Sequence, residues 1–237
     1  MNLGVLALAA ALAVGAPTAP TAPAAAECAV TDATMTWGFK ESFRSYISGT
    51  IANGDWSVAD GATYTTPNFG WTNGTGTIFD GDGDVGFRGS IEFTGHGGIL
   101  DTTVANPRLQ FTGWSNATLV MDVAGTTQQG AAVDAKAVKF AAVDLSAAQY
   151  REGAVTIKDA PVTLTTAGAA AFGTYPAGER LDPVTISFTA DPACTVAPPS
   201  RPGAFFVIWL AFASALAVTV ITIELVLRRR RAQAPGA

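Results

Sequence analysis

The sequence predicts a mostly β protein: an antiparallel β-sandwich or partly open barrel with one or two short helices, plus a C-terminal transmembrane helix. Three observations predict this class. Short apolar runs alternate with turn-forming clusters of Gly, Asn and Asp along most of the 237 residues. One stretch near the start of the predicted domain has helical spacing instead. An uncharged apolar run lies close to the C-terminus.

The first segment has the features of a secretory signal peptide. Leu3 to Val14 is an apolar run, and Ala24 to Ala26 supplies the small residues that signal peptidase requires. We therefore expect cleavage before Glu27, with a signal peptide over residues 1–26 and an exported domain over residues 27–195.

A helical pattern opens the domain at Trp37–Ile47. Its apolar side chains form one stripe at i, i+4, i+7 and i+8, namely Phe39, Phe43, Tyr46 and Ile47. Such a stripe ordinarily packs into a core. A second, shorter helix is expected at Ala147–Tyr150.

Strand-like runs separated by turn signals fill most of the remaining domain. We expect strands at Asp55–Val58, Asn68–Trp71, Gly76–Phe79, Val85–Phe93, Arg108–Phe111, Ala117–Val123, Ala137–Leu145, Val155–Leu164 and Val184–Thr189. The run Val85–Phe93 does not alternate cleanly, which predicts a bulge within it. About nine strands at this spacing favour a sandwich or barrel over a βαβ fold.

The C-terminal region predicts a membrane anchor. Ala204 to Ile223 is uncharged for twenty residues, enough to span about 30 Å of hydrocarbon as a helix. Four arginines, Arg228 to Arg231, follow and favour a cytoplasmic tail. We expect a linker over residues 196–203, a transmembrane helix over 204–227 and a basic tail over 228–237. The protein would then lie in the cell membrane with its N-terminal domain outside.

Cys28 and Cys194 are the only cysteines, and they bracket the predicted domain. Because disulfides persist outside the cytosol, we expect one bridge between them. Two cysteines and a single histidine cannot supply the four ligands of a structural zinc site. A lipoprotein anchored through Cys28 is the alternative, but Glu27 stands where a lipobox has a small residue.

The charge of the predicted domain argues against nucleic acid as a partner. The chain carries 14 basic and 19 acidic residues, a net charge of -5. Leaving out the four tail arginines and Glu224 leaves 10 basic and 18 acidic residues, a net charge of -8. A surface this acidic does not suit phosphate backbones, which need a basic patch.

Residues able to carry out catalysis are sparse. His96 is the sole histidine, no G-x-S-x-G motif accompanies it, and few carboxylates cluster, so we expect no enzyme activity. Asp80, Asp82 and Asp84 have the spacing that begins a calcium loop. Ile91 stands where an EF-hand needs its bidentate Glu, so a hairpin tip is the favoured interpretation.

Three longer motifs resemble the haem-transport-associated (Htaa) domain of actinobacterial surface proteins. They are WGFKESFRSYI at 37–47, GHGGILDTTVANPRL at 95–109 and FGTYPAGERLDPVTISF at 172–188. The resemblance covers about residues 34–190 in the same order. It implies a ferric haem ligand, with Tyr46 as the axial ligand to the iron and His96 as the group that supports the ligand oxygen.

The resemblance also implies further residues around the haem. Phe39, Phe43 and Phe69 are candidates to cover the macrocycle, and Tyr175 in the Y-P-A-G motif is a candidate contact. Arg44 and Ser45 are candidates to hold the propionates, although both are equally explained as solvated helix residues. Whether Tyr64 contributes is left open. The chemistry is consistent, because ferric haem accepts a phenolate oxygen as axial ligand.

These expectations describe a membrane-anchored surface protein that captures haem and passes it toward a haem importer. Host haemoproteins, other surface haem-binding proteins and a haem ABC transporter are the expected partners besides haem itself. The alternative is a β-sandwich adhesion or interaction module at the cell surface that binds no haem. The two differ in whether Tyr46 and His96 converge in space.

Overall fold

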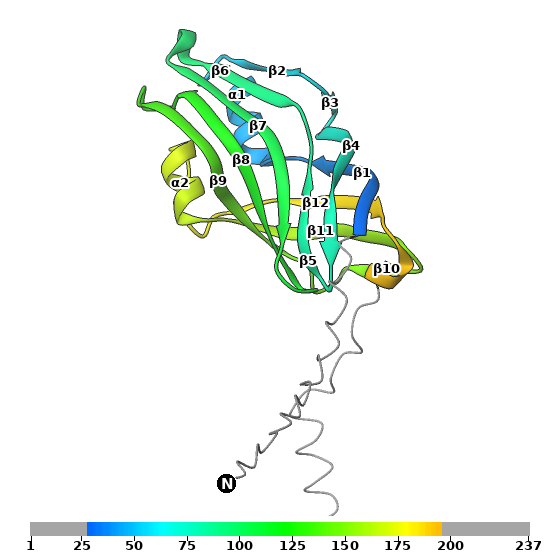
Figure 1. Ribbon diagram of the computed structural model, residues 1–237. Helices are drawn as coiled ribbons and strands as arrows, with labels where there is room; N and C mark the ends of the chain where they lie inside the picture. Colours follow the sequence, from blue (N-terminus) through cyan, green and yellow to red (C-terminus); the bar gives the residue numbers. More distant parts are fainter. Residues whose placement is uncertain (1–27, 196–237) are drawn as a thin grey trace, which may run out of the picture. The chain divides into compact units, whose positions relative to one another are not determined.

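The computed structural model describes residues 28–195, which form one compact unit of β-strands and short helices (Figure 1). The expected signal peptide, linker, transmembrane helix and basic tail lie outside these residues. Within residues 28–195, no helix combines the length and apolar composition needed to cross a membrane.

Twelve strands, two α-helices and two 3-10 turns make up the described residues. In chain order they are β1 (Cys28–Trp37), α1 (Glu41–Ser48), β2 (Asp55–Ala59), β3 (Ala62–Thr65), β4 (Asn68–Phe79), β5 (Asp82–Gly86), β6 (Ser90–Gly95), η1 (His96–Gly98), β7 (Leu100–Phe111), β8 (Asn116–Thr126), β9 (Ala132–Asp144), β10 (Gln149–Arg151), β11 (Ala154–Leu164), α2 (Thr166–Phe172), β12 (Arg180–Thr189) and η2 (Pro192–Cys194).

Eight of the strands close into a ring. The antiparallel order is β7-β5-β4-β1-β12-β11-β9-β8, and β8 pairs again with β7. The predicted mostly β class with one or two short helices is therefore confirmed. The predicted sandwich or partly open barrel is replaced by a closed, barrel-like sheet, because both edges of β7 are paired. The other strands extend the ring: β6 and β2 continue from β7, β3 pairs with β4, and β10 pairs with β11.

The strand β7 joins the ring to the region that carries His96. Its first half pairs with β6 and its second half with β5, while β8 runs along the other edge. The register with β8 shifts between Ala105 and Arg108, at the Asn106-Pro107 pair. Proline cannot donate to the sheet, so it is tolerated at such an irregularity. The hairpin of β6 and β7 thereby projects from the ring with η1 at its tip (Figure 1).

An aromatic cluster fills the interior beneath α1. Phe39 is fully buried, and its ring centroid lies 4.7 Å from that of Trp37 and 5.2 Å from those of Phe93 and Phe172. Phe43 of α1 is also fully buried and lies 5.0 Å from Phe93. Each buried aromatic side chain stabilises the fold by about 1.5–3 kcal/mol. This cluster fixes α1 against the interior of the sheet.

Several predicted elements differ from the observed ones. The first helix begins at Glu41 rather than Trp37, because Trp37 ends β1 and pairs with Val184 and Phe69. The helix expected at Ala147–Tyr150 is wrong: β10 pairs there with β11. The strands β1, β3 and β10 and the helix α2 were not predicted.

Other predicted strands have different bounds. The two runs at Asn68–Trp71 and Gly76–Phe79 belong to the single strand β4. The run Val85–Phe93 divides into the two strands β5 and β6 at Gly89. Gly89 has a φ of 131°, a backbone conformation that residues with a side chain rarely adopt. The hairpin tip expected around Asp80 is confirmed, because the turn between β4 and β5 lies there.

Cys28 and Cys194 form the expected disulfide, with their Cα atoms 6.2 Å apart. The bridge links the start of β1 to η2, so it joins the two ends of the described chain across a separation of 166 residues.

Candidate functional site

Tyr46 and His96 meet at one end of the domain, although 50 residues separate them. Tyr46 Oη and His96 Nε2 form a hydrogen bond, and the ring centroids lie 5.7 Å apart at an interplanar angle of 51°. Both side chains are partly exposed. A phenol oxygen and an imidazole nitrogen are therefore in contact where a ligand can reach them from solvent.

The helix α1 presents Tyr46 because of its apolar stripe. Phe43 and Ile47 are fully buried, and Tyr46 lies between them on the same side of the helix. The ring of Tyr46 packs 6.3 Å from that of Phe43. Burial of the two neighbours thus orients the phenol while its hydroxyl stays at the surface.

The backbone at His96 has an unusual conformation that aims its imidazole. His96, Gly97 and Gly98 have φ angles of 53°, 62° and 96°, all in the left-handed region. Residues other than glycine adopt this backbone region at a cost of about 1–2 kcal/mol. The His96 N–H donates to the Ala52 carbonyl at 2.7 Å, which holds the strained residue beside the end of α1.

Two exposed isoleucines flank His96. Ile51 is 75% exposed and precedes Ala52, the residue that accepts the His96 N–H. Ile99 is 57% exposed and follows the glycine pair. A Cβ added to Gly97 or Gly98 would meet nothing within 4 Å, so the space beside the imidazole is open. Ile51 and Ile99 therefore add exposed apolar side chains close to the backbone of His96.

Tyr175 reaches the same helix from the chain that follows α2. Its hydroxyl is 3.2 Å from Ser42 Oγ, one turn before Tyr46 on α1. Its ring lies 6.4 Å from that of Phe172 at an angle of 14°, and Lys40 Nζ is 5.1 Å from its centroid. The structure therefore places Tyr175 against the first turn of α1, and its role as a haem contact stays a prediction.

The remaining candidates differ in their exposure and position. Phe39, Phe43 and Phe69 are fully buried in the core. Ser45 is exposed on α1. The ring of Tyr64 packs 4.8 Å from that of Phe69 and 5.3 Å from that of Trp56.

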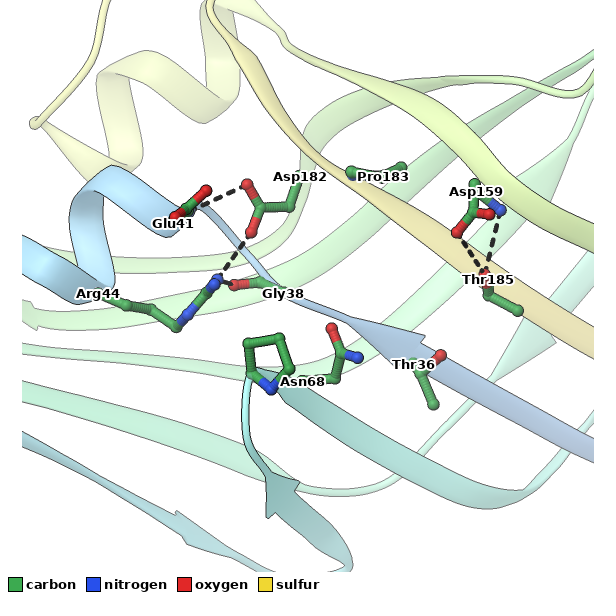
Figure 2. A pocket seen from close by; sticks show the side chains of 10 residues that line it. Thr36, Gly38, Glu41, Arg44, Asn68, Asp159, Asp182, Pro183 and Thr185 are labelled. Atoms are coloured by element: carbon green, nitrogen blue, oxygen red, sulfur yellow. Dashed lines mark hydrogen bonds and ion pairs between the residues drawn. The ribbon is translucent and has the colours of Figure 1, made fainter.

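Arg44 is turned to the other side of α1 from Tyr46. At 100° per residue, positions 44 and 46 of a helix point in nearly opposite directions. The Arg44 guanidinium forms an ion pair with Asp182 at 2.7 Å and donates to the Gly38 carbonyl. These residues line a groove of about 430 Å³ that Figure 2 shows from close by.

Sequence reasoning missed three residues of the site. Ser42 lies one helical turn before Tyr46, and that spacing could have placed it on the same face. Ile99 follows a left-handed glycine pair, and its side chain lies 3.6 Å from where a Cβ of Gly130 would be, in the turn between β8 and β9. Ile51 had no sequence signal, because its place beside His96 depends on the bond between His96 and Ala52.

The described residues hold no group of three or more His, Cys, Asp or Glu side chains placed to bind a metal ion.

Comparisons with known proteins identify a family and solved structures that this chain resembles. The sequence profile of the Htaa family matches residues 32–187. The C-terminal domain of HtaA from Corynebacterium glutamicum has 34% sequence identity and a TM-score of 0.64, covering 69% of this chain and 99% of that domain. For the N-terminal domain of HtaA from the same organism, the identity is 34%, the TM-score 0.57, and the coverage 68% and 97%.

A third similar structure is that of a heme binding protein. The heme binding protein HtaB from Corynebacterium glutamicum has 25% identity and a TM-score of 0.54, covering 70% of this chain and 96% of that one. No match to this chain is found among curated protein sequences. Given the family profile over residues 32–187 and the two domains at 34% identity, this chain belongs to the Htaa family.

Proposed function

We propose that this protein binds ferric haem through Tyr46, with His96 as the hydrogen-bond partner of the ligand oxygen. The observation that carries the proposal is the contact between Tyr46 Oη and His96 Nε2 in a partly exposed site. Membership of the Htaa family and the likeness to a heme binding protein support the same ligand.

The pair solves a protonation problem. A tyrosine phenol ordinarily has a pKa of about 10, so ligation at neutral pH would need the positive charge of the iron to favour the phenolate and a neighbouring base to take the proton. His96 Nε2 would be that base, and its N–H would then donate a hydrogen bond to the phenolate oxygen. The imidazole thereby fixes the ligand's orientation and its charge.

The surroundings of the Tyr46–His96 pair suit a flat ligand that has both apolar and polar edges. Ile51 and Ile99 offer apolar surface beside His96, and Ser42 and Tyr175 offer hydroxyl groups further along α1. Arg44 is already paired with Asp182, so Ser45, Ser42 and Tyr175 are the better placed polar groups for the propionates.

A haemin titration of the purified protein tests the assignment. Tyr46→Phe keeps the ring and removes the oxygen, so we expect it to abolish the Soret band of bound haem. His96→Ala leaves the ligand in place and should weaken haemin binding about 10–100-fold. Tyr64→Phe is the matched control and should bind as the wild type does.

The opposite pattern would overturn the assignment. If Tyr46→Phe retains full affinity and spectrum while His96→Ala abolishes binding, His96 is the direct ligand. A wild-type protein that binds no haemin would favour the adhesion or interaction module instead.

We also propose that the domain is held at the outer face of the cell membrane and passes haem toward an importer. The apolar run at 204–223 and the arginines at 228–231 support this orientation. Alkaline phosphatase fused after Pro199 should be active in cells, and the same enzyme fused after Arg231 should be inactive. Activity at both sites would contradict a cytoplasmic tail.

A further inference from the structure

One carboxylate from the far end of the chain holds the first turn of α1. The Glu41 N–H donates to Asp182 Oδ1 at 3.0 Å, and Arg44 Nη1 lies 2.7 Å from Asp182 Oδ2 (Figure 2). The backbone of Asp182 is engaged as well. Its N–H donates to the Phe39 carbonyl at 3.0 Å, and its carbonyl accepts from Trp37 Nε1 at 2.8 Å. Asp182 of β12 therefore binds the segment leading into α1 through four separate bonds.

This carboxylate replaces a cap that α1 does not supply itself. Lys40 occupies the N-cap position and makes no side-chain cap hydrogen bond. A negative charge at a helix N-terminus satisfies a free N–H and interacts favourably with the helix dipole. An eight-residue helix is not stable alone, so its position depends on such tertiary contacts.

The ion pair between Arg44 and Asp182 is mostly shielded from solvent. The side chain of Arg44 is 9% exposed and that of Asp182 is 25% exposed. A buried guanidinium without its carboxylate is strongly unfavourable, which ties the helix to β12. Gly38 leaves the room that the pair needs, because a Cβ there would lie 2.4 Å from Asp182 Oδ2 and 3.0 Å from Arg44 Nη1.

We infer that Asp182 is a positioning residue for the Tyr46 phenol. It acts through Glu41 and Arg44, and it sets where α1 places Tyr46 relative to His96. Tyr46 lies five residues after Glu41 on the same short rigid helix, so a shift of the first turn moves the phenol oxygen. This inference deepens the proposed function and rests on it where haem affinity is concerned.

The test compares two carboxylates of the same groove. Asp182→Asn keeps an oxygen for the Glu41 N–H but removes the charge that pairs with Arg44. Asp159→Asn is the matched control, because Asp159 lines the groove and its carboxylate accepts a hydrogen bond from Thr185 on β12 at 3.4 Å. The double variant Arg44→Met with Asp182→Asn leaves no unpaired charge, so it stays informative if Asp182→Asn folds poorly.

Two readouts separate positioning from a general loss of stability. His96 is the only histidine, so its ring resonances in the haem-free protein report the Tyr46–His96 contact without overlap. Haemin affinity and the ferric absorption spectrum report ligation. We expect Asp182→Asn and the double variant to shift the His96 resonances and to weaken haemin binding about tenfold with an altered spectrum. Asp159→Asn should change neither.

The outcomes distinguish this inference from the proposed function. Unchanged His96 resonances and unchanged haemin affinity in both Asp182 variants would overturn the positioning role, even if their melting temperatures fall. Shifted resonances in the Asp182 variants, together with intact haemin binding by Tyr46→Phe, would support the positioning of Tyr46 and overturn its role as haem ligand.

Discussion

The carboxylate of Asp122 illustrates how a single residue stabilises an irregular part of the sheet. It accepts the Ala137 N–H at 2.9 Å and the Asn106 side-chain amide at 3.3 Å, and Lys136 Nζ lies 3.7 Å away. Both Asn106 and Ala137 have φ angles of 51°, at places where the strands depart from regular pairing. Desolvation raises the pKa of Asp122, but these three partners outweigh it and hold the pKa below its ordinary value of 3.8.

The lowered pKa of Asp122 predicts acid sensitivity. Because the folded-state pKa lies below the unfolded one, the carboxylate stabilises the fold above about pH 4, and this contribution is lost as the pH falls through the folded-state value. Asp122→Asn cannot ionise. We expect the difference in free energy of unfolding between wild type and Asp122→Asn, measured with urea, to shrink as the pH falls from about 5 to about 2. Asp134→Asn on β9 is the control. A difference that does not vary with pH would contradict the prediction.

The exposed side chain of Ile99 predicts a loss of haem binding without a loss of stability. Ile99→Ser removes apolar surface beside His96 that is already 57% exposed in the protein without ligand. We expect the free energy of haemin binding to become less favourable by about 1 kcal/mol, or roughly fivefold in affinity, because less apolar area is buried on binding. The midpoint of urea unfolding should stay the same.

Phe79→Ser provides the control for this prediction. Phe79 is 42% exposed at the end of β4, so the change is of the same kind but away from the Tyr46–His96 pair. Equal losses of haemin affinity in both variants would show that Ile99 has no special place in the site.

Sequence patterns alone could not bring the site together. The helical stripe of α1 was predictable from spacing, whereas a role for the sole histidine was implied only by the resemblance to a family. Their meeting across 50 residues was implied only by resemblance to a family. The contact depends on the bond from His96 to Ala52 and on a left-handed backbone at His96, and neither has a local sequence signal.

At the level of elements, the errors follow from broken periodicity. The strand β1 buries Val30, Ala33, Met35 and Trp37, but its register shifts between Thr31 and Thr34. The interrupted alternation hides the strand, and the aromatic residues that follow extend the apparent helix back to Trp37. The strand β10 is only three residues long. Its Tyr150 hydroxyl donates to the Trp114 carbonyl at 2.9 Å, so a contact distant in sequence favours the extended conformation there.

The helix α2 depends on a single capping residue. Thr165 Oγ1 accepts the Gly168 N–H at 2.9 Å, and Gly173 ends the helix with a φ of 70°. Thr165→Ala should lower the free energy of unfolding by about 1 kcal/mol, measured by urea denaturation, because one N-terminal N–H loses its partner. Thr165→Ser keeps the hydroxyl and should retain most of the stability. Equal losses in the two variants would assign the effect to the methyl group instead.

For the whole molecule, the class of fold was predictable and the closure of the sheet was not. Alternating apolar residues indicate that many strands exist, but they do not say which strand pairs with which. Closure depends on β7 and β8, which pair along almost their whole length, and on β1 between β4 and β12. Closure gives each of the eight strands a partner on both sides over at least part of its length, although β9 pairs with β11 only at Ala141–Val143.

The disulfide is expected to stabilise the whole domain. Closing a loop of this length removes entropy from the unfolded chain worth about 5 kcal/mol. Replacing both Cys28 and Cys194 by Ser should lower the free energy of unfolding by about that amount. Wild-type protein treated with a thiol reductant should unfold at about the same urea concentration as this double Ser variant. A reductant effect on the double Ser variant would point to a different cause.

The bridge between Cys28 and Cys194 also fixes where the two ends of the described chain lie relative to the Tyr46–His96 pair. It gathers both ends of the described chain beside β10, and Figure 1 shows the turn between β6 and β7, which contains His96, at the opposite end of the molecule. Any attachment made before Cys28 or after Thr195 therefore holds the domain by the same pole. The phenol of Tyr46 and the imidazole of His96 lie at the opposite pole, so such an attachment would be made away from them.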